Sequence, residues 1–128
     1  MQFQDNFSFM MGKAKGTSQK PVRLEDTIPE TNLVAMIHQE FAEIDRLKDL
    51  KFYNGFDDLD YLTFTTLSLP SGNRVGLVRH KNSPAPGIEI CVSYNHPNIA
   101  EVLKEALMEM NLTILDLTWI HPEYKNSL

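Results

Sequence analysis

The apolar residues between positions 88 and 94 constrain the fold more than any other feature of this sequence. They occupy every second position: Ile88, Ile90, Val92 and Tyr94. A period of two residues puts these side chains on one face of a β-strand and their polar neighbours on the other. We therefore predict a strand over residues 88–94 that buries one face, and such a strand needs partner strands beside it.

Two segments upstream have the composition of strands. Residues 61–69 are rich in Tyr, Thr, Phe and Leu, which favour strands. Residues 70–73, Pro-Ser-Gly-Asn, are typical of a tight turn, and residues 74–80 follow as a hairpin partner. Residues 81–87 contain two prolines and a glycine, so we expect a loop there. Together with residues 88–94, these segments predict a three-stranded antiparallel meander.

Two helices are predicted around these strands. Thr27 and Glu30 have the spacing of a capping box, with Pro29 in the first turn. Apolar residues then recur at intervals of three or four: Leu33, Ile37, Phe41, Ile44 and Leu47. This stripe predicts a helix of about 18 residues. Asn95 is the expected N-cap of a second helix, and Asn111 is suited to its left-handed end.

The remaining segments complete an α+β fold with the order α-β-β-β-α-β. Residues 51–60 contain Asn54-Gly55 and an acidic run, so we predict a loop there. Residues 112–120 are apolar and predict a last strand, which the second helix connects as a crossover, parallel to the third strand. Each helix has one apolar stripe, so we expect both on one face of the sheet, with the other face partly open.

Residues 1–26 differ from the rest of the chain, and we predict an N-terminal arm followed by a single domain over residues 27–128. The arm begins with an apolar cluster: Phe3, Phe7, Phe9, Met10 and Met11. A linker containing Gly12 and Gly16 and rich in lysine follows. We interpret the cluster as a docking peptide on a tether; the alternative is a frayed terminus. Trp119 is a further candidate partner-binding residue, because tryptophan is enriched at interfaces.

Composition excludes several classes of protein. The net charge of −5 excludes a basic footprint for nucleic acid over the whole molecule. The single cysteine, Cys91, excludes an internal disulfide. No apolar run approaches the roughly 20 residues that span a bilayer, and the first residues lack the basic region of a signal peptide. We therefore expect a cytoplasmic protein with no membrane contact.

No pattern of residues predicts a catalytic or metal site. The four histidines do not have the spacing of paired ligands: His38, His80, His96 and His121. Cys91 has no cation beside it in the sequence to lower its pKa. There is no glycine-rich phosphate loop or nucleophile elbow. We expect no catalytic residue, no metal and no cofactor.

A basic segment is the candidate anion site. Arg74, Arg79, His80 and Lys81 lie on or directly after the second strand. Basic side chains at one edge of a sheet are suited to a phosphate or carboxylate. The alternative is a charged edge strand that blocks unwanted strand pairing.

The C-terminal part carries Ile99-Ala100 at the start of a predicted helix and ends with Ile120-His121-Pro122-Glu123. With these residues it loosely resembles the small XisI-type proteins of cyanobacteria, which are linked to excision control. The tryptophan- and glycine-containing strands usual in that family are not matched here, so no residue role is carried over.

The sequence thus favours a non-catalytic protein-interaction module, an adaptor or a small subunit of a complex, with a protein partner or a second copy of the chain. The arm and the open sheet surface are its expected binding sites. The first alternative is a binder of small anions or nucleic acid that uses residues 74–81. An enzyme with a dispersed site is the second alternative.

Overall fold

The computed structural model describes residues 31–56, 61–93 and 95–128. The predicted arm, residues 1–26, lies outside these residues. The strands in this part of the chain are β2 Thr31–Ile37, β3 Tyr53–Phe56, β4 Tyr61–Ser68, β5 Arg74–His80, β6 Glu89–Ser93 and β7 Leu117–Ile120. The helices are α2 Ile99–Glu109 and the short 3-10 helices η2 Phe41–Glu43, η3 Asp45–Leu47, η4 Ile114–Asp116 and η5 Pro122–Ser127.

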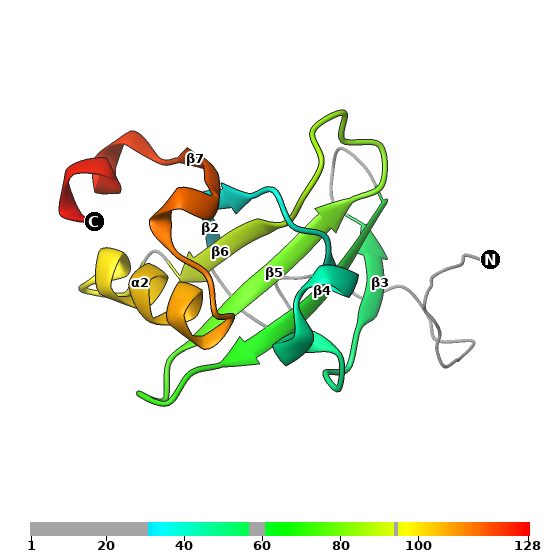
Figure 1. Ribbon diagram of the computed structural model, residues 1–128, viewed down its shortest axis with the longest axis horizontal. Helices are drawn as coiled ribbons and strands as arrows, with labels where there is room; N and C mark the ends of the chain where they lie inside the picture. The colour runs from blue at the N-terminus through cyan, green and yellow to red at the C-terminus, as the bar shows by residue number, and fades with distance from the viewer. Residues whose placement is uncertain (1–30, 57–60, 94) are drawn as a thin grey trace.

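The strands form one six-stranded sheet in which every neighbouring pair is antiparallel, with the order β3-β4-β5-β6-β2-β7. Figure 1 shows the twisted sheet with β3 at one edge and β7 at the other. The sheet and helices together give the α+β class that the sequence predicts.

The predicted meander of three strands is confirmed in β4, β5 and β6. The β4–β5 hairpin pairs Leu62 with His80 at one end and Ser68 with Arg74 at the other. Its turn contains Gly72, whose φ of +96° is a conformation that glycine adopts without a steric penalty. The turn residues singled out in the sequence therefore lie where the chain reverses.

The loop predicted over residues 51–60 is wrong in its first half, where β3 extends the meander. Gly55 lies within the strand, buried and opposite Leu62. Tyr53 stacks on Phe64 of β4 with 5.4 Å between ring centroids. This cross-strand aromatic pair favours the extended backbone, so Asn54-Gly55 is part of a strand and not a turn.

The helix predicted to begin near Thr27 is also wrong. Its first described residues form β2, which pairs with β6 on one side and with β7 on the other. The apolar run from Leu33 to Ile37 suits a strand that is paired on both edges, and this pairing decides against the helix. Ile44 and Leu47 are still buried. Ile44 lies between η2 and η3, and Leu47 is the last residue of η3.

The last strand differs from its predicted form. Residues 114–116 form η4, and only Leu117–Ile120 is strand, antiparallel to β2. Because β2 is antiparallel to both β6 and β7, the latter two run in the same direction. The expected parallel orientation is present, but β2 lies between the two strands and they do not pair.

The second predicted helix is confirmed as α2, with its cap shifted by three residues. Asn98, and not Asn95, is the N-cap, and its side chain accepts a hydrogen bond from the Glu101 backbone N–H. Asn111 has a φ of 61°, the left-handed conformation expected after the helix.

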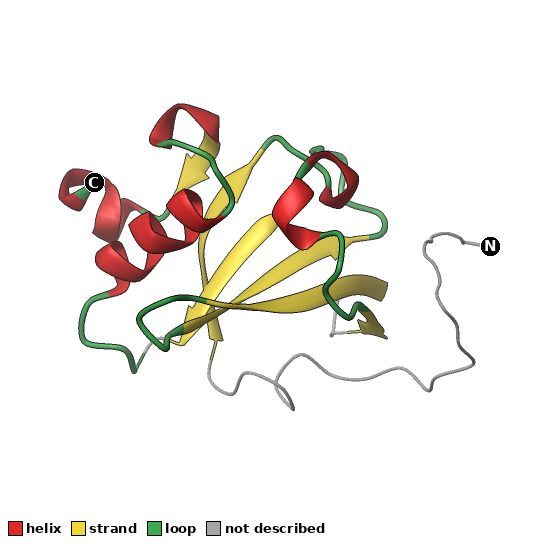
Figure 2. Ribbon diagram, turned by 60° about the horizontal axis from the view of Figure 1, so that its bottom comes forward, coloured by secondary structure: helices red, strands yellow, loops and turns green. Residues whose placement is uncertain are grey.

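The sheet buries apolar side chains on both faces. We call the face that α2 covers the first face, and the opposite one the second face. The described helices lie on the first face (Figure 2), over a core that includes Ile37, Val75, Leu77, Ile90 and Leu103. The second face carries a separate buried cluster: Leu62, Phe64, Val78 and Cys91. The expectation of a partly open second face is therefore wrong at its centre.

The apolar residues of the predicted first helix and third strand divide between these faces. Six of them lie in the core of the first face: Ile37, Ile44, Leu47, Ile88, Ile90 and Val92. Val102, Leu103 and Leu107 of α2 lie in the same core. Phe41 packs against that core while partly exposed, whereas Leu33 packs against the cluster on the second face. No helix in the described ranges is long and apolar enough to cross a membrane.

Candidate functional site

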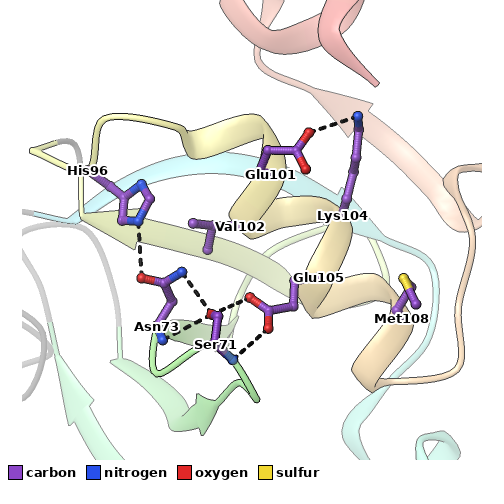
Figure 3. Close-up of a pocket in the computed structure, with 8 residues that line it drawn as sticks. All are labelled: Ser71, Asn73, His96, Glu101, Val102, Lys104, Glu105 and Met108. Atoms are coloured by element: carbon purple, nitrogen blue, oxygen red, sulfur yellow. Dashed lines mark hydrogen bonds and ion pairs between the residues drawn. The ribbon is translucent and has the colours of Figure 1, made fainter.

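A depression of about 460 Å³ lies where the β4–β5 turn meets α2. Ser71 and Asn73 reach it from the turn, and His96 reaches it from the segment before α2 (Figure 3). Glu101 and Glu105 line its helix side. Serine, histidine and glutamate are residue types that catalytic sites use. The hydrogen bonds between them decide whether this depression could activate a nucleophile.

The side chains form a chain of hydrogen bonds with a fixed direction. The backbone N–H of Asn98 donates to His96 Nδ1 at 2.9 Å, so the ring proton is on Nε2. His96 Nε2 then donates to Asn73 Oδ1 at 3.0 Å, and Asn73 Nδ2 donates to Ser71 Oγ at 2.9 Å. The Ser71 hydroxyl donates to Glu105 Oε1 at 2.5 Å.

In this direction His96 is not the base that would activate Ser71 as a nucleophile, and the Ser71 hydroxyl donates to the Glu105 carboxylate instead. A general base must accept the hydroxyl proton, whereas His96 donates its proton and is separated from Ser71 by the Asn73 amide. Glu105 also accepts from the Ser71 backbone N–H at 2.8 Å. The hydrogen bonds therefore attach the β4–β5 turn to α2, and we assign them a structural role.

Within the described residues, no group of three or more His, Cys, Asp or Glu side chains could hold a metal ion. Cys91 lies at the centre of the second face and is buried. Burial, reinforced by the negative charge of Glu89, raises the pKa of its thiol to about 12. The thiol is therefore protonated at neutral pH and unsuited to nucleophilic attack.

The predicted anion site is not assembled into one cluster. Arg74 and His80 lie at opposite ends of β5, which are about 20 Å apart at the rise of a strand. Arg79 belongs to the first face, where its Nε donates to Glu40 Oε1 at 2.9 Å. His80 belongs to the second face, where it lies 2.9 Å from Glu89. Lys81 is exposed after the strand.

Arg79 and His80 thus point to opposite faces of the sheet, each beside a carboxylate. The geometry does not favour a common anion held by residues 74–81.

Three of the exposed large apolar side chains in the described residues lie within six residues of the chain, on β7 and on η4 directly before it. Trp119 is 39% exposed on β7, Ile114 is 53% exposed on η4, and Leu115 beside it is 90% exposed. We call these three residues the β7 edge surface. The Trp119 ring also meets the His121 ring edge to face, with 6.1 Å between centroids.

Of these residues, the sequence predicted only Trp119 as a partner contact. Ile114 and Leu115 were missed because residues 112–120 were assigned to one strand. Thr113 and Asp116 form a capping box around η4, and that spacing was the available sign of a helical turn. The other predicted partner contacts, Phe3, Phe7, Phe9 and Met10, lie outside the described residues.

Comparison with known proteins finds no matching family model, no similar curated protein and no similar solved structure. The resemblance to XisI-type proteins therefore gains no support from a family model.

Proposed function

We propose that this chain is a non-catalytic protein-interaction module, an adaptor or small subunit that binds a protein partner through the β7 edge surface. The observation that supports this proposal is the exposure of Ile114, Leu115 and Trp119 within six residues of the chain. Leu115 contributes almost its entire side chain to the surface, and a partner that covers it gains the free energy of apolar burial.

The position of β7 in the sheet supports the same surface. β7 is the last strand in the order, and it pairs with β2. An edge strand offers backbone groups to an added strand, and natural proteins usually protect such edges by keeping them short, by charge or by a covering element. β7 is short, but its sequence Leu-Thr-Trp-Ile has no charged residue. Tryptophan is also enriched among residues that carry most of the binding energy at interfaces.

The apolar cluster of the arm is the second contact in this proposal. Phe3, Phe7, Phe9 and Met10 are joined to the domain by a glycine- and lysine-rich linker. Two moderate contacts on one chain bind a common partner more tightly than either does alone, because the second contact forms at high effective concentration. The cytoplasmic location expected from the sequence belongs to this proposal as well.

Affinity purification of the full chain from its native host tests the proposal. The variants Leu115→Lys and Trp119→Lys place a charge on the β7 edge surface. The matched control is Tyr61→Lys, which changes an exposed aromatic residue on β4, four strand positions away from β7. Quantitative mass spectrometry compares the recovered proteins with those from the unaltered chain.

We expect a protein that co-purifies with the unaltered chain and with Tyr61→Lys. Its recovery should fall about tenfold or more with Leu115→Lys, as expected when a buried apolar contact is replaced by a charge. Equal recovery with all variants would assign the contact to another surface. If no partner is recovered and light scattering shows a monomer, the proposed function is wrong.

A further inference from the structure

The cluster on the second face is buried although the described helices lie on the first face. Leu62, Phe64, Val78 and Cys91 are each between 0% and 7% exposed. The strand register places them on one face, since Phe64 is paired with Val78 and Cys91 with Gly76. The described apolar residues that pack against them, Leu33 and Tyr53, belong to the same sheet.

Such burial requires a second layer of atoms over the sheet. Neighbouring side chains on a strand surface cover one another from the sides, but an open face leaves their ends in water. Phe64 at 0% and Val78 at 1% exposure have no such open end. Because α2 and the 3-10 helices lie on the first face (Figures 1 and 2), no described helix supplies this layer.

The segments outside the described ranges differ in length, and length decides which one is the candidate for this layer. Residues 57–60 and residue 94 are too few to cross several strands. The cluster and its neighbours extend from β3 to β2, about 19 Å at the spacing of strands. Residues 1–30 are long enough for this span, and the chain leaves them at Thr31, which the register places on the same face as Cys91.

Within this segment, the residues nearest β2 have suitable side chains. Val22, Leu24 and Ile28 fall within ten residues of Thr31. The aromatic cluster at Phe3, Phe7 and Phe9 is separated from them by the glycine-containing linker. Residues close to a fixed attachment point lose less chain entropy on docking than distant ones.

We propose that the second face of the sheet is a docking surface for residues 20–30 of the same chain, with Val22 and Leu24 as its apolar contacts. The docked segment completes a second core over Phe64, Val78 and Cys91. It leaves the aromatic cluster of the arm available to a partner, and it makes the domain begin near residue 20. This proposal does not depend on the proposed function, because it concerns contacts within one chain.

Cys91 is a built-in probe of this contact, because it is the single cysteine of the chain and lies on the second face. The rate at which iodoacetamide alkylates its thiol in the full chain measures how often the face is uncovered. The test variant is Val22→Asp with Leu24→Asp, which places charges in the proposed contact. The matched control is Phe7→Asp with Phe9→Asp, the same change in the aromatic cluster.

We expect the Val22→Asp, Leu24→Asp chain to be alkylated at Cys91 about tenfold faster or more, since its local opening is easier. The Phe7→Asp, Phe9→Asp chain should react at the rate of the unaltered protein. Ile90→Ala, which weakens the core of the first face, shows how much acceleration comes from general destabilisation. If the double aspartate variant does not fold, the alkylation rate of Cys91 in Leu24→Ala is compared with that of the unaltered chain instead.

Three results would overturn the proposal. Cys91 could remain equally protected when Val22 and Leu24 are changed. The Phe7→Asp, Phe9→Asp chain could react faster instead, which would make the aromatic cluster the cover. Finally, protection could rise with protein concentration, which would identify a second copy of the chain as the cover.

Discussion

The Nε atom of Arg79 donates a hydrogen bond to Oε1 of Glu40 across 2.9 Å and so attaches β5 to the segment that leaves β2. The other oxygen of Glu40, Oε2, accepts from the backbone N–H of Gly87 at 3.0 Å. The Glu40 carboxylate thus joins the segment after β2 both to β5 and to the loop before β6, each of which is about 40 residues or more away in the sequence.

Glu40→Ala should therefore destabilise the fold more than Arg79→Ala does. The first substitution removes both hydrogen bonds and leaves the Gly87 N–H without its acceptor, for a loss of about 1–2 kcal/mol. The second removes a partly exposed ion pair, worth about 0–1 kcal/mol. Urea denaturation measures both losses, and equal values would contradict the role given to Gly87.

Gly87 is expected to tolerate no side chain. Its φ is +98°, and a Cβ atom there would lie 1.8 Å from the backbone oxygen of Ile37. Gly72 is the matched control, since its φ is +96° but a Cβ would meet nothing within 4 Å. Gly72→Ala should cost about 1–2 kcal/mol from backbone strain, and Gly87→Ala about 3 kcal/mol or more.

Thermal and denaturant unfolding of the two alanine variants make this comparison. If both variants lose the same stability, the close approach of Gly87 to β2 is not a constraint on the fold.

Ile90→Ala tests the core of the first face. Ile90 is fully buried between neighbouring strands and beneath the helix layer, so its truncation should cost about 2–5 kcal/mol. Ile114→Ala, at a half-exposed position, should change the free energy of unfolding by about 0.5 kcal/mol or less. A similarly small loss for Ile90→Ala in denaturant melts would show that the face of β6 is wrongly assigned.

Asp116 should make stability depend on pH in the acidic range. The hydrogen bond from the Thr113 backbone N–H, followed by the one from Gln39, lowers the pKa of the Asp116 carboxyl below its ordinary 3.8. A carboxyl whose pKa is lower in the folded state stabilises the fold above its unfolded pKa. That stability is lost as the pH falls through the folded pKa.

The measurement is the free energy of unfolding between about pH 6 and pH 2, for the unaltered chain and Asp116→Asn. The unaltered chain should be the more stable at the upper end, and the difference should shrink below 3.8. Parallel curves for the two proteins would contradict the contribution of Asp116.

Local patterns in the sequence determined the central part of the fold. The turn residues at 70–73 and the strand composition around them predicted β4 and β5, and β5 has the bounds that were expected. The alternation after Gly87 predicted β6, and Asn111 predicted the end of α2. These elements follow from interactions between residues close in the chain, so their signals are present in short windows of sequence.

Tertiary pairing decided the elements toward both ends of the sheet. The apolar residues from Leu33 to Ile37 fit a helix as well as a strand, and β2 became a strand because β6 and β7 satisfy its backbone on both sides. Asn54-Gly55 entered β3 because Tyr53 stacks on Phe64. The exposure of Leu115 likewise depends on η4 preceding β7. The free energies that decide these elements come from hydrogen bonds and burial between residues that are distant in the sequence. Patterns within short stretches of sequence therefore do not predict them.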